Sequence, residues 1–151
     1  MKKVLAVVLT LVLVLSLTAC SGANIDGSWK IVSMTEDGKD SFEGFDLKAF
    51  EAKGVYLGIK CKDGKATMDI MGEVTEFTYD GKTFSGKNEE GKTESIEYTV
   101  NGDTLKLTND NVVMTFKKMT DAEAKAFDAQ DSDAVMNALM EIYLSALGSD
   151  D

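Results

Sequence analysis

The sequence contains no histidine, no proline and no arginine, and all 16 of its basic residues are lysines. Without histidine there is no imidazole to act as a general base, to complete a serine triad or to ligate a metal ion. These absences argue against most hydrolases and metalloenzymes. They predict a protein that is not an enzyme and that holds no cofactor and no metal.

Positive charge is also scarce. The 16 lysines stand against 26 acidic residues, which gives a net charge of −10, or −12 when Lys2 and Lys3 are left out. Such an acidic surface repels the phosphate backbone of nucleic acids, so nucleic acid is not an expected partner. At 151 residues the chain is long enough for one buried core and too short for two ordinary domains.

A long apolar run occurs only at the N-terminus. Two lysines precede an almost wholly apolar stretch from residue 4 to residue 17. This stretch has about 14 residues, whereas a helix that spans a bilayer needs roughly 20. The pattern predicts a signal peptide over residues 1–19. Leu17-Thr18-Ala19-Cys20 resembles the bacterial lipobox, in which the cysteine thiol receives a lipid before cleavage.

We therefore expect Cys20 to be the lipid attachment site, carrying diacylglycerol and palmitate, with residues 20–24 as a tether. This places the protein on the extracytoplasmic face of the cell membrane. Ser21 stands where an aspartate would mark retention in the inner membrane, so in a cell with two membranes we expect the outer one. The alternative is an ordinary secretion signal with an incidental cysteine. Cys61 is the other cysteine, and it is interpreted either as a small buried side chain or as a reactive thiol.

The region from residue 25 to residue 119 alternates strand patterns with turn dipeptides. Pairs such as Asp63-Gly64 and Asn101-Gly102 favour tight hairpins, and no crossover helix separates them. Strands are expected at 29–34, 55–62, 65–71, 73–79, 82–87, 92–100, 103–108 and 111–118, with a short helix over 45–53. The predicted fold class is mostly β, an antiparallel up-and-down meander of about eight strands. Closure into a barrel would remove its two free edges.

The pattern becomes helical after residue 119. Thr120 and Glu123 have the spacing of a capping box, and Asp131 or Ser132 is suited to cap a second helix. Apolar residues then recur at a spacing of three to four and form a wide stripe: Val135, Met136, Leu139, Met140, Ile142, Tyr143, Ala146 and Leu147. Two interpretations are open, packing against the barrel or a lid or partner surface. Residues 148–151 are expected to be a frayed acidic tail.

Gly27-Ser28-Trp29 stands at the head of the first predicted strand and resembles the Gly-x-Trp motif of lipocalin-like proteins. With the lipobox and tether before it, the chain is most similar to small bacterial lipocalin-like lipoproteins. The resemblance implies that residues 25–147 form a lipocalin-like barrel domain with C-terminal helices. It also implies that Trp29 closes one end of the barrel beneath a basic side chain, here Lys117 or Lys118.

The same resemblance implies a calyx for a small apolar ligand. The residues expected to line it are Trp29, Leu57, Met68, Tyr98, Met114 and Phe116. Large inward side chains can also fill an eight-stranded barrel completely, so a solid core and a ligand cavity are both open. The sequence thus predicts a non-catalytic, lipid-anchored, lipocalin-like protein that binds a small apolar ligand. The alternative is a cell-surface protein-interaction or inhibitor module with a filled core.

Overall fold

The computed structural model of the chain describes residues 24–147, except residues 71 and 89. The expected signal peptide, the proposed lipid site Cys20, the tether up to residue 23 and the acidic tail lie outside the described residues. Within the described part, no helix combines the length and the apolar character needed to cross a membrane.

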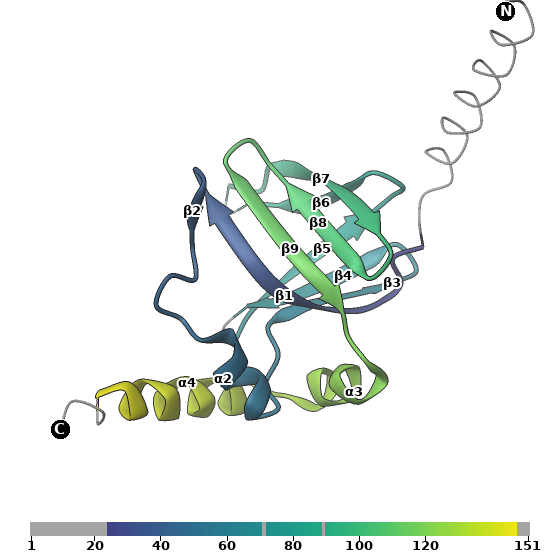
Figure 1. Cartoon of the computed structure of the whole chain (residues 1–151). Helices are drawn as coiled ribbons and strands as arrows, with labels where there is room; N and C mark the ends of the chain where they lie inside the picture. Colours follow the sequence, from purple (N-terminus) through teal and green to yellow (C-terminus); the bar gives the residue numbers. More distant parts are fainter. Residues whose placement is uncertain (1–23, 71, 89, 148–151) are drawn as a thin grey trace, which may run out of the picture.

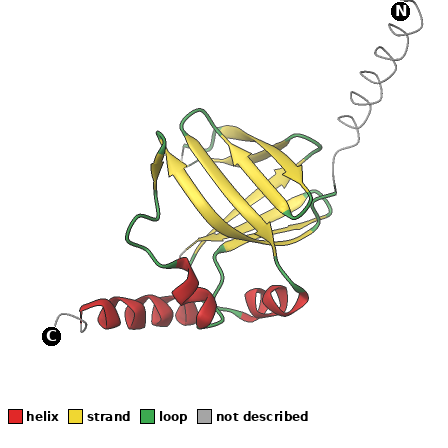
Figure 2. Ribbon diagram, in the orientation of Figure 1, coloured by secondary structure: helices red, strands yellow, loops and turns green. Residues whose placement is uncertain are grey.

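The strands form one continuous antiparallel sheet that closes on itself (Figures 1 and 2). Each strand pairs with the next along the barrel, and β1 also pairs with β9, so eight strands make a closed barrel. The strands are β1 (Gly27–Glu36), β2 (Lys39–Asp40), β3 (Gly58–Lys62), β4 (Lys65–Ile70), β5 (Glu73–Tyr79), β6 (Thr83–Lys87), β7 (Thr93–Asn101), β8 (Thr104–Thr108) and β9 (Val112–Lys118). The predicted fold class is confirmed.

Tight turns set the register of the hairpins. Asp63 and Gly64 both have positive φ, as do Asp37 and Gly38, and a two-residue type I′ turn requires this at both central positions. The Asp37-Gly38 turn leads into β2, a two-residue strand that the sequence did not predict. It pairs only with the last residues of β1 and lies outside the closed barrel.

The barrel core consists of the inward-facing residues of alternating strands. One cluster of buried side chains extends from Trp29 on β1 to Phe116 on β9, and aromatic residues such as Phe84 and Tyr98 belong to it. Phe84 and Tyr98 meet edge to face, with ring centroids 5.1 Å apart. Strands that are apolar on one side and polar on the other therefore bury one continuous face.

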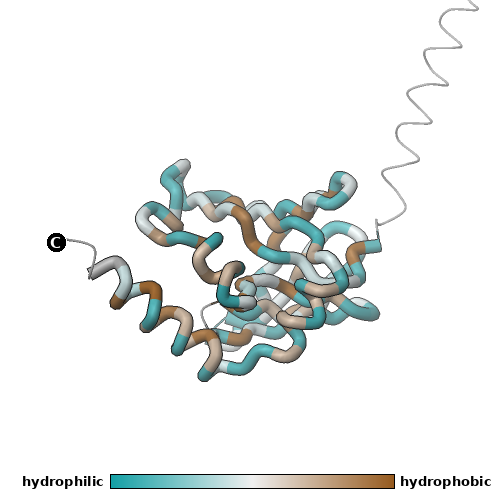
Figure 3. The backbone as a smooth tube through the Cα atoms, turned by 60° about the horizontal axis from the view of Figure 1, so that its bottom comes forward, coloured by the Kyte–Doolittle hydropathy of each residue, from teal (hydrophilic) through white to brown (hydrophobic). Residues whose placement is uncertain are grey.

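Three helices of the described chain lie outside the barrel (Figure 1). They are α2 (Leu47–Ala52), α3 (Asp121–Ala129) and α4 (Ser132–Leu147). The predicted capping box of α3 is present, because Thr120 and Glu123 bond each other reciprocally. Phe50 of α2 and Val135 of α4 belong to a second, smaller buried cluster. In Figure 3, apolar and polar residues alternate along α4, so only part of the helix surface can be covered by this contact.

Trp29 is expected to contribute strongly to stability. It is 1% exposed, and its indole Nε1 donates to the carbonyl oxygen of Ile25 at 2.8 Å. Trp29→Ala should lower the free energy of unfolding by about 3–5 kcal/mol in denaturant titrations, because it removes a large buried side chain. Its native fluorescence should be blue-shifted and move to the red on unfolding.

Val32→Ala is the matched control, since Val32 lies on the same strand but is 42% exposed. It should cost less than about 1 kcal/mol. Equal costs for the two variants would contradict the burial of Trp29 at the barrel end.

Candidate functional site

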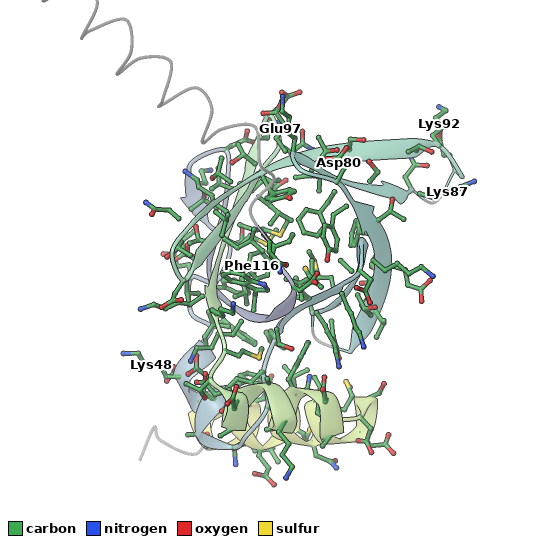
Figure 4. All side chains as sticks on the ribbon, turned by 90° about the vertical axis from the view of Figure 1, so that its right-hand side faces the viewer. Lys48, Asp80, Lys87, Lys92, Glu97 and Phe116 are labelled. Atoms are coloured by element: carbon green, nitrogen blue, oxygen red, sulfur yellow. The ribbon has the colours of Figure 1, made fainter. Side chains whose placement is uncertain are left out.

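The six residues expected to line a calyx all face the barrel interior. Each of them is less than 10% exposed, and all belong to the same buried cluster: Trp29, Leu57, Met68, Tyr98, Met114 and Phe116. Figure 4 shows Phe116 inside the ring of strands, among many other interior side chains. The interior of an eight-stranded barrel is just wide enough for side chains to fill. The packing of this cluster therefore favours a filled core in this conformation.

The Gly-x-Trp segment lies at one end of the barrel, where β1 and β9 meet. Lys118 places its Nζ 5.5 Å from the centre of the Trp29 ring, close enough for a cation–π contact. Gly27 lies beside the same lysine, because a Cβ on Gly27 would be 3.6 Å from Lys118 Cε. Lys117 pairs with Lys30 and is exposed. Of the two lysines named by the resemblance, Lys118 is therefore the one that covers Trp29.

Cys61 lies in the barrel core and is 2% exposed. Desolvation by burial, together with the nearby negative charge of Asp26, raises the pKa of the Cys61 thiol to about 12. A thiol must ionise to react as a nucleophile. The geometry therefore gives Cys61 the role of a small core side chain.

Lys30 forms a charged centre on the outer side of β1 that the sequence did not reveal. Its Nζ donates to Glu51 of α2 at 2.7 Å and to Glu123 of α3 at 2.8 Å, and it lies 5.9 Å from the centre of the Tyr56 ring. Burial alone would lower the pKa of the Lys30 ammonium, but the two carboxylates outweigh it and raise this pKa. One lysine thus joins β1 to two helices.

The C-terminal end of α3 is fixed to β3 and to the segment before it by a second set of contacts. The Gln130 side chain accepts from the backbone N–H of Tyr56 at 3.0 Å and donates to the carbonyl oxygen of the same residue at 2.8 Å. Lys60 of β3 donates to Asp128 at 2.6 Å. These contacts join residues more than 60 positions apart, so no local sequence pattern could have indicated them.

The exposed apolar surface is concentrated on α4. Met136, Met140, Tyr143 and Leu144 are each more than half exposed, and they recur at helical spacing along one face. The opposite face packs inward through Val135, which is fully buried. One side of the apolar stripe is therefore buried against α2 and Val55, and the side that carries Met136, Met140 and Tyr143 is exposed.

A groove of about 770 Å³ lies on the barrel wall between β5 and β6. It is lined by residues 74–78 of β5 and 85–87 of β6, together with residues 65–67 of β4 and Thr93 of β7. Its volume exceeds those of three other surface grooves, which are about 310, 360 and 420 Å³. Sequence reasoning missed it because local patterns do not show how many residues of two neighbouring strands pair.

Acidic side chains are abundant but dispersed. Among residues 24–70, 72–88 and 90–147, no three histidine, cysteine, aspartate or glutamate side chains are arranged to hold a metal ion. Three aspartates lie near the junction of α3 and α4 and do not form a metal site. Asp128 pairs with Lys60, Asp131 accepts from the backbone N–H of Ala134, and Asp133 lies in the first turn of α4. Asp131 therefore caps α4, and Asp128 holds α3 against β3.

The Lys30 centre predicts a specific pH dependence. The bond from Lys30 lowers the pKa of Glu123 below its ordinary value of 4.5. The ionised carboxylate therefore stabilises the fold at every pH above about 4.5, and this stabilisation is lost as the pH falls through the lower folded value. At pH 7, Glu123→Gln should lower the free energy of unfolding by about 0.5–1 kcal/mol, because the contact is partly exposed and glutamine still completes the capping box.

Urea titrations at several pH values measure this difference, and the two proteins should converge at acid pH. Glu90→Gln is the control, because its pairing with Lys92 is local and well exposed. A difference for Glu123→Gln that persisted unchanged in acid would rule out the ion pair as its cause.

Comparisons with known proteins return no match: no protein-family model, no curated protein and no solved structure is significantly similar to this chain. The interpretation of the site therefore rests on the chain's own residues and geometry. These establish a closed barrel of eight antiparallel strands with an extra strand and flanking helices, an architecture that is consistent with a lipocalin-like fold.

Proposed function

We propose that this protein is a non-catalytic, lipid-anchored binding module of the extracytoplasmic surface, built on a lipocalin-like barrel, which recognises a partner protein through its outer face. The observation that carries the proposal is the exposed stripe of α4. Soluble proteins seldom leave four large apolar side chains together in water unless something covers them. Two of the four are methionines, whose flexible side chains adapt to a partner's surface.

The barrel itself supports this role as a scaffold. Its interior is occupied by the buried cluster that runs from Trp29 to Phe116, and its helices are fixed to the wall by the Lys30 centre. Two features support the non-catalytic part of the proposal: the sequence has no histidine, and burial keeps the Cys61 thiol protonated.

A second function, carriage of a small apolar ligand, is favoured by a different observation. All six residues expected to line a calyx converge on one interior cluster, and two of them, Met68 and Met114, have side chains that can repack. For a ligand to enter, part of this cluster must move aside. Native mass spectrometry of the protein after mild extraction distinguishes the two functions, because only a carrier would retain a small apolar molecule.

The anchor is tested at Cys20. Cys20→Ala should abolish incorporation of labelled fatty acid and leave the protein either as uncleaved precursor or released from the membrane, because no thiol remains for diacylglycerol. Cell fractionation with metabolic labelling measures both effects. Cys61→Ala is the control and should still be labelled. Label of equal intensity in Cys20→Ala would exclude this residue as the lipid site.

The partner surface is tested by site-specific photocrosslinking in cells that express the full chain. A photoreactive amino acid at Met140, in the middle of the stripe, should give a crosslinked product that contains a second protein. The same amino acid at Lys106, an exposed position on β8, is the control and should give no such product. Leu144→Glu should abolish the product at position 140 by placing a charge in the apolar contact.

Three outcomes would contradict this proposal. A product of twice the monomer mass would mean that a second copy covers the stripe, and crosslinks to lipid alone would indicate a membrane surface. Equal products at positions 106 and 140 would show that the stripe has no special role.

A further inference from the structure

The pairing of β5 with its two neighbours is unequal. Six residues of β5, from Glu73 to Thr78, pair with β4 without interruption. Among the described residues, β5 pairs with β6 only through Thr78–Ser85 and Tyr79–Phe84. The barrel wall therefore contains a seam, which begins where Phe77 of β5 passes Gly86 of β6.

Phe77 and Gly86 mark the point at which the pairing of β5 with β6 ends. A Cβ on Gly86 would lie 2.7 Å from Cδ1 of Phe77, so the aromatic ring occupies the space that a side chain of β6 would need. The Phe77 ring also meets Phe84 edge to face, with centroids 6.4 Å apart. Beyond this point β6 continues with β7 as a hairpin, and Figure 4 shows Lys87 and Lys92 at the tip of that hairpin, projecting away from the rest of the barrel.

The main chain of β5 presents hydrogen-bonding groups to this seam. The N–H of Tyr79 donates to Gly64 at 2.9 Å, on the β4 side. Alternate residues of an antiparallel strand direct their main-chain groups to opposite neighbours. The N–H and C=O groups of Val74 and Glu76 therefore point away from β4, into the groove of about 770 Å³.

Two of the devices that usually protect a sheet edge, a bulge and a proline, are absent from β5. The register between β4 and β5 shows no bulge, and the sequence contains no proline. Val74 is 57% exposed in the middle of the edge. By contrast, the edge formed by β2 is only two residues long, and both of them are charged and exposed.

We propose that the seam between β5 and β6 is a binding site for an extended peptide segment, which adds to β5 as an antiparallel strand. The groove has the volume of a typical ligand site, and its walls supply both main-chain partners and side-chain contacts. Cross-strand pairing with Glu76 favours a basic residue in the peptide, and Val74 favours a β-branched one. No residue of α4 lines this site, so the test of the peptide site is independent of the test of the partner surface proposed above.

A second copy of the chain is a poorer occupant of this edge. An antiparallel pairing of β5 with β5 centred on Glu76 would place the two Glu76 side chains opposite each other, and each copy carries a net charge of −10. Like charges on paired strands are destabilising. The acidic edge thus selects a peptide with basic side chains over another copy of itself.

The test uses the full-length protein and an acetylated seven-residue peptide in which valine alternates with threonine or lysine. Hydrogen exchange is read at single amides by NMR. In the free protein the amides of Val74 and Glu76 should exchange rapidly, and the peptide at about 1 mM should slow both of them. The same peptide with alternate backbone nitrogens methylated should have no effect, because it lacks the donors of one edge.

The protein side is tested with a pair of variants at one position. Val74→Pro removes an N–H that faces the groove, and proline is tolerated on an unpaired edge. It should weaken peptide binding about tenfold, the equivalent of one lost hydrogen bond. Val74→Thr keeps both the N–H and the branched side chain and should bind as the parent does.

Each remaining outcome overturns the proposal. Slow exchange at Val74 and Glu76 in the free protein would mean that the edge is already paired. No protection by about 1 mM peptide, or equal protection by the methylated peptide, would exclude strand addition. Protection that depends on protein concentration alone would assign the edge to a second copy, and changes confined to α4 would place the peptide elsewhere.

Discussion

The double pairing of β1 is the constraint on which the rest of the structure depends. Its first residues pair with β3 and its later residues with β9, so this one strand converts an open meander into a closed barrel. A shift in register between Ile31 and Ser33 accompanies the change of partner. Trp29 lies where both pairings overlap, and its burial by Lys118 and Ile25 ties the first strand to the last. Closure also leaves β1 with an outward Lys30 on which α2 and α3 converge, so the helices depend on the same strand.

Much of the barrel could be predicted because its signals are local. Aspartate–glycine and asparagine–glycine pairs determine where a chain reverses, and strict alternation determines which side of a strand is buried. The capping box of α3 could also be predicted from the local sequence, since Thr120 and Glu123 are only three residues apart. The first strand was expected to be shorter than it is, because neither Gly27 nor the polar residues after Met34 favour a strand by themselves. Pairing with β9 extends it to Glu36.

The features with functional interest could not be predicted, because each depends on residues far apart in the sequence. The Lys30 centre joins side chains from three separate elements. The free half of the α4 stripe is defined only by what α2 covers, and periodicity cannot divide a wide stripe into a buried and an exposed part. The seam begins where the Phe77 ring takes the space above Gly86, a contact between two strands that no local pattern indicates. Sequence patterns predict that strands are adjacent, but not how many of their residues pair.

The position of the first described residues has a consequence for orientation. Ile25 is buried beneath Trp29, so the chain enters the barrel at its tryptophan-closed end. With the proposed lipid on Cys20, the five residues from 20 to 24 would span at most about 17 Å when fully extended. The maximum length of this tether is roughly half the thickness of a bilayer's hydrocarbon core. The domain would then lie close to the lipid surface, with the end of the barrel that holds Trp29 facing the membrane.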